Sequence, residues 1–239
     1  MIKVEGLYKS LGGEEVLNNV SFEVASGEIV AILGPSGTGK TVLLKHLIGL
    51  MRPDRGRVLI DGVDISHLEE EELLNVRKSI GYMFQEGALY DFLDVFDNVA
   101  FPLREHTDMP PEKIKDRVHE VLGMVDLEDV DAKLPAELSG GMKKRVGLAR
   151  AIVLGAKILL CDEPTSGLDP IRSRDISNSI QAVARKIKAT TVMTSHDIPN
   201  SLRIADRLII LNEGSIAAAG TKDQICADTT PFVKEFVRT

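Results

Sequence analysis

The stretch Gly34-Pro35-Ser36-Gly37-Thr38-Gly39-Lys40-Thr41 decides the fold. It follows a short apolar run, Ile29 to Leu33, and precedes a segment whose apolar residues recur with helical spacing. A strand, a glycine-rich loop and a helix in this order bring backbone N–H groups and the positive end of the helix dipole to one point. We therefore expect the loop to bind an anion through its backbone.

Glycines and two side chains make this loop more specific. Gly34, Gly37 and Gly39 lack the Cβ atoms that would keep backbone N–H groups away from phosphate oxygens. Lys40 is expected to place its ammonium between the β- and γ-phosphates of a nucleoside triphosphate, and the Thr41 hydroxyl to coordinate Mg²⁺. The pattern therefore predicts ATP and Mg²⁺ as ligands.

A second stretch, Leu138-Ser139-Gly140-Gly141-Met142, precedes an amphipathic helix. Ser139 is a suitable N-cap, and the N–H groups of Gly140 and Gly141 can bind an anion at the helix terminus. The two stretches in this order resemble the ATPase subunit of an ATP-binding cassette (ABC) transporter, over nearly the whole chain. The resemblance implies an α/β fold: a RecA-like P-loop core with a mostly parallel sheet, an N-terminal antiparallel β subdomain and an inserted α-helical subdomain.

The order of elements along the chain fits that expectation. Between Gln85 and Leu154 the pattern is mainly helical, so we expect one ABC ATPase domain over residues 1–239 with a helical subdomain at about 86–155. The tail from Lys222 to Thr239 predicts one or two short helices. Strands that alternate with helices are predicted at Val16–Val24, Glu28–Leu33, Val58–Ile60, Ile80–Phe84, Ile158–Asp162, Thr190–Thr194 and Arg207–Leu211.

Two adjacent carboxylates, Asp162 and Glu163, follow the apolar residues after Lys157. A buried parallel strand that delivers acids to the edge of a sheet has this pattern. By resemblance to the Walker B motif, Asp162 would hold Mg²⁺ through its water shell and Glu163 would act as the general base. Asp169 lies in a run that matches the family's D-loop, and it is implied to bridge the two halves of a dimer.

Gln85 and His196 each follow a predicted strand. His196 matches the switch histidine of the family, which implies a hydrogen bond to the γ-phosphate and the attacking water. Gln85 matches the Q-loop glutamine, which implies contact with Mg²⁺ and the water and a hinge to the helical subdomain. The resemblance thus implies catalytic roles for Glu163, His196 and Gln85, and Mg²⁺ ligation by Thr41, Gln85 and Asp162.

One copy of this chain is expected to form only half of the working ATPase. Ser139, Gly140 and Gly141 should lie far from Lys40 within a subunit, and the family forms a head-to-tail homodimer in which this stretch completes the partner's ATP site. The sequence departs from the family at Leu11, where an aromatic residue usually stacks on adenine. Loss of the ring would remove a contact worth about 1 kcal/mol.

Composition excludes several classes of protein. The 239 residues carry a net charge of -7 without a basic cluster, which argues against a nucleic-acid partner. No run approaches the roughly twenty apolar residues of a membrane span, and no signal-peptide pattern is present, so a cytosolic protein is expected. Cys161 and Cys226 indicate neither a disulfide framework nor a metal site, and structural packing is expected for both.

The residues after Gln85 carry the identity of the membrane partner. The runs Gly87-Ala88-Leu89 and Val95 to Glu105 resemble the ATPases of Mla-type, Mce-linked lipid transporters. This implies a phospholipid or other hydrophobic cargo, a separate MlaE-like permease, an Mce-domain protein, a small regulatory subunit as an optional component, and a peripheral location on the cytoplasmic face of the inner membrane. The alternatives are the ATPase of an importer for a polar solute such as an amino acid, and a soluble ABC protein of DNA repair or translation.

Overall fold

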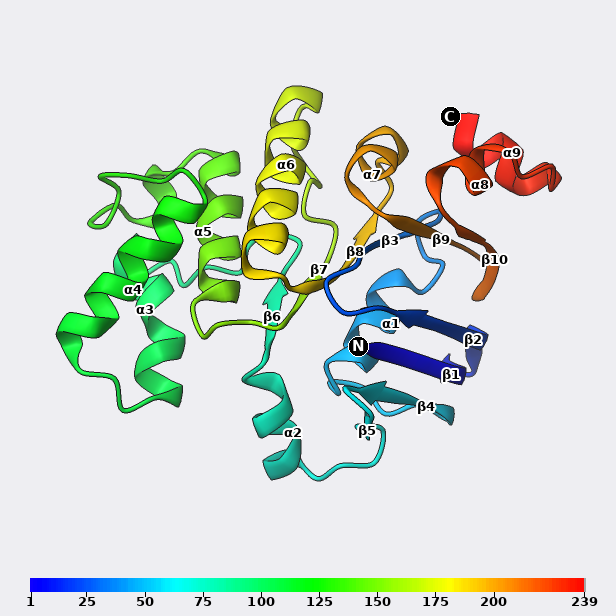
Figure 1. Cartoon of the computed structure of the whole chain (residues 1–239), viewed down its shortest axis with the longest axis horizontal. Helices are drawn as coiled ribbons and strands as arrows, with labels where there is room; N and C mark the ends of the chain where they lie inside the picture. The colour runs from blue at the N-terminus through cyan, green and yellow to red at the C-terminus, as the bar shows by residue number, and fades with distance from the viewer. Residues whose placement is uncertain (239) are drawn as a thin grey trace. The chain divides into compact units, whose positions relative to one another are not determined.

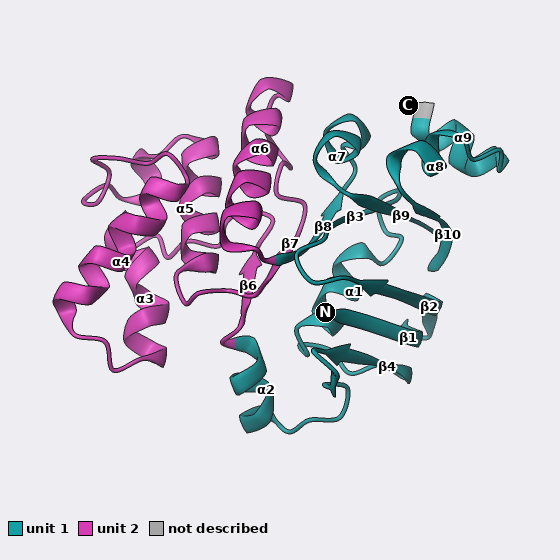
Figure 2. Cartoon of the chain, in the orientation of Figure 1, with its two compact units in different colours: residues 1–77, 190–239 teal, residues 78–189 magenta. Residues whose placement is uncertain are grey.

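The structure is a computed structural model that describes residues 1–238 (Figure 1). The chain forms two compact units (Figure 2). Unit 1 holds residues 1–77 and the residues from Thr190 onward, and unit 2 holds residues 78–189. In sequence, unit 2 is therefore an insertion into unit 1.

The N-terminal part of unit 1 is an antiparallel sheet, as expected. Its strands are β1 (Ile2–Leu11), β2 (Glu14–Val24), β4 (Arg55–Ile60) and β5 (Val63–Asp64), in the order β2-β1-β4-β5. Along β1, residues 2, 4 and 7 are buried, so one face of the strand packs into the core.

A second set of strands in unit 1 positions the phosphate loop. β3 (Ile29–Leu33) runs parallel to β8 (Thr190–Ser195) and β9 (Arg207–Asn212), and β10 (Ser215–Gly220) is antiparallel to β9. All residues of β3 are buried, which explains its uninterrupted apolar run. The helices of this unit are α1 (Lys40–Leu47), α2 (Glu70–Arg77), α7 (Ile198–Ile204), α8 (Lys222–Cys226) and α9 (Pro231–Arg238).

The C-terminal helices complete a hydrophobic cluster of unit 1. Val233 of α9 and Ile225 of α8 are buried with Leu33 of β3 and Ile210 of β9. Phe232 and Phe236 stack on one another with ring centroids 5.7 Å apart and pack against the same cluster. The prediction of one or two short helices in the tail is thus confirmed, since the tail contains α8 and α9.

Unit 2 combines a parallel strand pair with helices. β6 (Ile80–Met83) pairs with β7 (Ile158–Cys161), and the helices are α3 (Val95–His106), α4 (Pro111–Met124), the 3₁₀ turn η1 (Pro135–Glu137), α5 (Gly140–Ile152) and α6 (Pro170–Ile187). Helix α5 is central, since it contacts β6, α3, α4 and α6. The predicted helical subdomain at 86–155 falls inside this unit, whose bounds are wider. The subdomain boundaries stay a prediction.

The two cysteines have different environments. Cys161 lies on β7 and is completely buried, so the prediction of structural packing holds for it. That prediction is wrong for Cys226, which is exposed because α8 buries only Ile225. Among residues 1–238, no helix is long and apolar enough to cross a membrane.

Candidate functional site

The phosphate loop occupies the turn from β3 to α1, and close approaches require two of its glycines, Gly34 and Gly39. A Cβ on Gly34 would lie 2.5 Å from the Leu211 carbonyl oxygen. Gly39 caps α1 with a φ of 92°, and a Cβ there would lie 2.9 Å from the Val16 carbonyl oxygen. Only glycine fits both places without a backbone shift.

Lys40 is bound by the loop that it follows. The residue is 7% exposed, and its ammonium donates to the Gly34 carbonyl at 2.8 Å and to the Pro35 carbonyl at 3.0 Å. The Thr38 hydroxyl also donates to Pro35 O, at 2.9 Å. A largely desolvated cation is therefore fixed beside a glycine-rich backbone at the start of a helix, an arrangement suited to phosphate.

His196 comes to the same edge of unit 1 as this loop. In the parallel pair of β3 and β8, Leu33 is paired with Ser195, so Gly34 and His196 are the next residues of adjacent strands. His196 is exposed. Asp197, the residue after it, caps α7 by accepting a hydrogen bond from the Asn200 N–H at 3.1 Å. The cap fixes the backbone immediately after the histidine.

Unit 2 carries the predicted acids at the end of β7. Asp162 is 6% exposed, and its N–H donates to the Met83 carbonyl at 2.9 Å. The Tyr82 hydroxyl donates to Asp162 Oδ2 at 3.3 Å. Burial, reinforced by the Asp162 charge, raises the pKa of Tyr82, so the phenol keeps the proton that it donates. Sequence reasoning missed Tyr82, because no motif marks it.

Glu163 has an unusual backbone conformation. Its φ is 43°, in the left-handed region that costs a non-glycine residue about 1 kcal/mol. The Glu163 carbonyl accepts a hydrogen bond from the Ser166 N–H at 3.1 Å, which closes the turn after β7. Strain of this kind persists where the surroundings fix the chain, and it is frequent at functional sites.

Gln85 joins the acids in unit 2. Its side-chain amide donates to the Ser166 hydroxyl at 3.2 Å, and its backbone carbonyl accepts a hydrogen bond from the Lys144 ammonium. The structure therefore brings Gln85, Asp162 and the turn after Glu163 together. Neither Ser166 nor Lys144 was singled out from the sequence as a partner of Gln85.

Two other predicted residues are helix caps. The Ser139 hydroxyl accepts a hydrogen bond from the Met142 N–H at 3.3 Å, which confirms the predicted N-cap of α5. Asp169 caps α6 by accepting from the Arg172 N–H at 3.0 Å. That N–H is the main reason that the pKa of Asp169 is lowered. The implied role of Asp169 between subunits stays a prediction.

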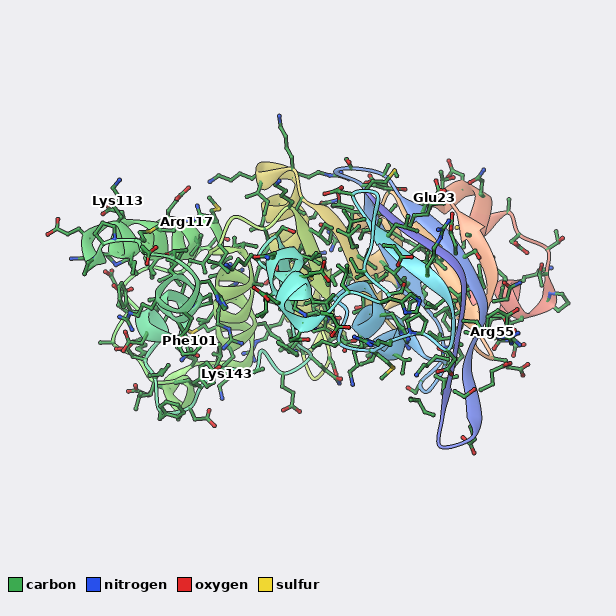
Figure 3. All side chains as sticks on the ribbon, turned by 90° about the horizontal axis from the view of Figure 1, so that it is seen from below. Glu23, Arg55, Phe101, Lys113, Arg117 and Lys143 are labelled. Atoms are coloured by element: carbon green, nitrogen blue, oxygen red, sulfur yellow. The ribbon has the colours of Figure 1, made fainter. Side chains whose placement is uncertain are left out.

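The position expected to face adenine is accessible. Leu11 is 41% exposed at the end of β1. Tyr8, the nearest aromatic residue in the sequence, is covered by Arg55, whose guanidinium carbon lies 4.0 Å from the ring centroid. Arg55 is labelled in Figure 3. The ring of Tyr8 is thus already engaged in a cation–π contact.

The ABC transporter family model matches residues 17–166. The chain belongs to the ABC transporter family. The matched range contains the phosphate loop, the Ser139-Gly140-Gly141 stretch and the two acids after β7. The resemblance stated from the sequence is therefore confirmed, and the chain is an ATP-binding ABC ATPase.

Curated relatives show the same membership and carry different names. The chain is 43% identical over 99% of its length to the probable ribonucleotide transport ATP-binding protein mkl of Mycobacterium leprae, and it spans 68% of that relative. It is 40% identical over its whole length to the intermembrane phospholipid transport system ATP-binding protein MlaF of Haemophilus influenzae, of which it spans 90%. It is 45% identical over 94% of its length to the methionine import ATP-binding protein MetN of Carboxydothermus hydrogenoformans, of which it spans 67%.

A solved ABC cassette confirms the α/β fold class. The cassette MJ0796, in a dimeric post-hydrolysis state bound to ADP and Pi, matches with a TM-score of 0.84 and 33% identity. The match covers 93% of this chain and 99% of that one. The ABC fold is therefore shared along nearly the whole chain.

Proposed function

We propose that this ABC ATPase powers the movement of phospholipid, or of another hydrophobic molecule, between membranes through a separate permease. The observation that carries the proposal is the similarity to MlaF along the whole chain. It includes residues 86–107, which resemble the Mla branch. The phosphate loop and the acids are common to ABC ATPases of every cargo, so they do not discriminate between cargoes.

The structure supports a membrane partner at this segment. The spacing of Phe92 from the neighbouring apolar residues would allow it to pack inside unit 2. The structure instead leaves its side chain 79% exposed. Tyr90 contacts Phe92 and Phe101, with ring centroids 5.8 and 5.0 Å apart. Asn98 is fully buried and holds the loop in place by donating to the carbonyls of Tyr90, Leu93 and Asp94. The exposed Phe92, beside Tyr90 on a fixed loop, suits a protein partner.

The residues of unit 1 are proposed to bind the nucleotide. The backbone N–H groups of Gly34 to Gly39 bind the phosphates, Lys40 neutralises charge between the β- and γ-phosphates, and His196 donates to the γ-phosphate. The buried, prearranged position of Lys40 suits this role, since little reorganisation is needed on binding.

The residues of unit 2 are proposed to carry out hydrolysis. Glu163 accepts the proton of the attacking water, and Gln85 orients that water. Thr41, Gln85 and Asp162 would hold Mg²⁺, Asp162 through water, and the ion would neutralise charge that develops on the phosphate oxygens. These hydroxyl, amide and carboxylate oxygens fit Mg²⁺, because the ion keeps several waters and shares its ligands with phosphates.

The proposed assembly is a homodimer at the cytoplasmic face of the inner membrane. In it, Ser139, Gly140 and Gly141 of one chain contact the ATP bound by the other, an MlaE-like permease docks on residues 86–107, and an Mce-domain protein, with or without a small regulatory subunit, completes the transporter. The exposed N-terminus of α5 is compatible with contact to a partner's nucleotide.

The competing proposal is an importer of a polar solute, which the similarity to MetN favours. The test is to isolate the tagged chain from native membranes in mild detergent and to identify the bound proteins and lipids by mass spectrometry. A permease with an Mce-domain protein and bound phospholipid is the expected result. A permease with a soluble-substrate receptor would support the importer and overturn the lipid proposal.

A further inference from the structure

Helix α5 is bonded along its length to the segment that follows β6. Lys144, which is 5% exposed, donates to the carbonyl of Gln85. Less than two turns further along the helix, the Arg150 guanidinium donates to the carbonyls of Gly87 at 2.8 Å and Ala88 at 2.9 Å. Three carbonyls of a four-residue segment therefore accept hydrogen bonds from cations of one helix.

Between the two cations the backbones are in close approach. A Cβ on Gly147 of α5 would lie 3.2 Å from Gly87 Cα, and a Cβ on Gly87 would lie 3.2 Å from the Lys143 carbonyl oxygen. Gly87 also has a φ of 78°. The pair of glycines lets the segment lie directly on the helix, so that the cations reach its carbonyls.

Burying the Lys144 cation beside this segment is energetically costly. Burial lowers the pKa of Lys144, while the nearby charges of Glu86 and Glu163 act in the opposite direction. A neutral side chain on α5 could fill the same space without desolvating a charge. The cation adds a strong, directed hydrogen bond to Gln85 and a charge near the predicted general base.

We propose that Lys144 and Arg150 are positioning residues that fix residues 85–88 to α5, so that a displacement of α5 carries Gln85 with it. The same helix begins at Ser139, Gly140 and Gly141. Engagement of that end by a partner's nucleotide is thereby transmitted to Gln85 through three carbonyl hydrogen bonds. The inference rests on the functions proposed for Gln85 and for the N-terminus of α5.

The test compares Lys144→Met with Arg145→Met in the full-length chain. Arg145 is a matched control, because it is the next residue of α5 and donates to a carbonyl elsewhere, Val125 O at 2.6 Å. Hydrogen exchange is followed by mass spectrometry in peptides covering 84–90 and 139–146, with and without ATP and Mg²⁺. ATPase kinetics and the melting temperature are measured on the same samples.

In the wild type and in Arg145→Met, ATP should slow exchange in both peptides. In Lys144→Met, peptide 139–146 should still respond, whereas peptide 84–90 should lose its response. We expect kcat to fall about tenfold and the Mg²⁺ concentration for half-maximal rate to rise, with little change in the KM for ATP, as for groups that orient a metal ligand. Lys144→Arg should restore most of the rate.

Equal responses of peptide 84–90 in Lys144→Met and Arg145→Met would overturn the inference while leaving the proposed ATPase function intact. A wild-type chain that neither binds nor hydrolyses ATP would overturn both. If Lys144→Met does not fold, Arg150→Gln, which keeps a neutral donor, gives the same comparison. It should weaken the coupled response of peptide 84–90, and an unchanged response would count against the proposal.

Discussion

The phosphate loop and the segment Gln85–Ala88 are held in place in opposite ways. Lys40 donates to carbonyls only six and five residues earlier, so the loop is closed by its own side chains. Gln85 and Gly87 depend on donors 59 and 63 residues away, both on α5. The hydrogen bonds that Lys40 makes to the first segment are therefore local, whereas the second segment is sensitive to substitutions that are distant in sequence.

The largest effect should come from Glu163→Gln, which separates ATP binding by the phosphate loop from ATP hydrolysis. The amide cannot accept a proton from water, so we expect turnover to fall by at least about a hundredfold while the phosphate loop still binds ATP. We also expect the variant to stay trapped as an ATP-bound dimer. Rapid-quench ATPase assays would measure the loss of turnover, and size-exclusion chromatography with ATP would detect the dimer. Near-normal hydrolysis would show that Glu163 is not the general base.

Lys40→Ala should weaken ATP binding by the phosphate loop. Loss of a charge-assisted contact to phosphate is expected to weaken ATP binding by about 10- to 100-fold. Titration calorimetry with ATP measures this directly. Because the hydrogen bonds from Lys40 to Gly34 and Pro35 lie within the phosphate loop, hydrogen exchange at 84–90 without nucleotide should stay as in the wild type. Unchanged affinity in the variant would contradict the proposed phosphate contact.

Gly147→Ala tests the distant contacts by geometry alone. Its Cβ would come 3.2 Å from Gly87 Cα, so the segment must shift by a few tenths of an ångström. Overpacking costs about 1–3 kcal/mol and the helix propensity of alanine returns about 1 kcal/mol, so we expect a net loss of about 1 kcal/mol of stability and a lower kcat. Gly123→Ala is the control, since its Cβ would meet nothing within 4 Å and the helix α4 should gain about 1 kcal/mol. Denaturant unfolding of both variants measures the difference. A Gly147→Ala chain as stable and active as the wild type would mean that the approach is not constraining.

Leu11→Tyr should give the smallest effect, which is tighter binding of ATP. The exposed position can accept a ring, and stacking on adenine is worth about 1 kcal/mol, or about a fivefold lower Kd for ATP. Calorimetry against ATP and against triphosphate alone would isolate the contribution of the base. If Kd for ATP does not change, another group already contacts adenine.

Strands with continuously buried, β-branched residues were predicted most accurately, and short strands or strands of low propensity were missed. β3 and β8 were found nearly to the residue because their burial is continuous. β10 is built largely of alanines with low strand propensity, and β5 has two residues. β1 alternates apolar residues with charged ones, and it was expected only through the family's antiparallel subdomain.

The residues of the candidate site also differ in how far they could be predicted from the sequence. The glycines and Lys40 were readable because they occur at fixed spacings within the single stretch Gly34 to Thr41, where Lys40 donates to Gly34. Lys144 stands in a run of basic residues that suggests a solvated helix face, and only the folded chain shows that its ammonium is buried against Gln85. Tyr82 was missed for the same reason, since its partner Asp162 is 80 residues away.

Packing of the C-terminal helix has a consequence for genetics. Val233 of α9 shares a cluster with Leu33, the residue immediately before the phosphate loop. A nonsense mutation after Cys226 would remove α9 and uncover that cluster, yet it would leave every residue of the loop in the coding sequence. Such an allele should behave as temperature-sensitive. The phosphate loop would be encoded intact, but β3, which precedes it, would have lost part of its hydrophobic packing.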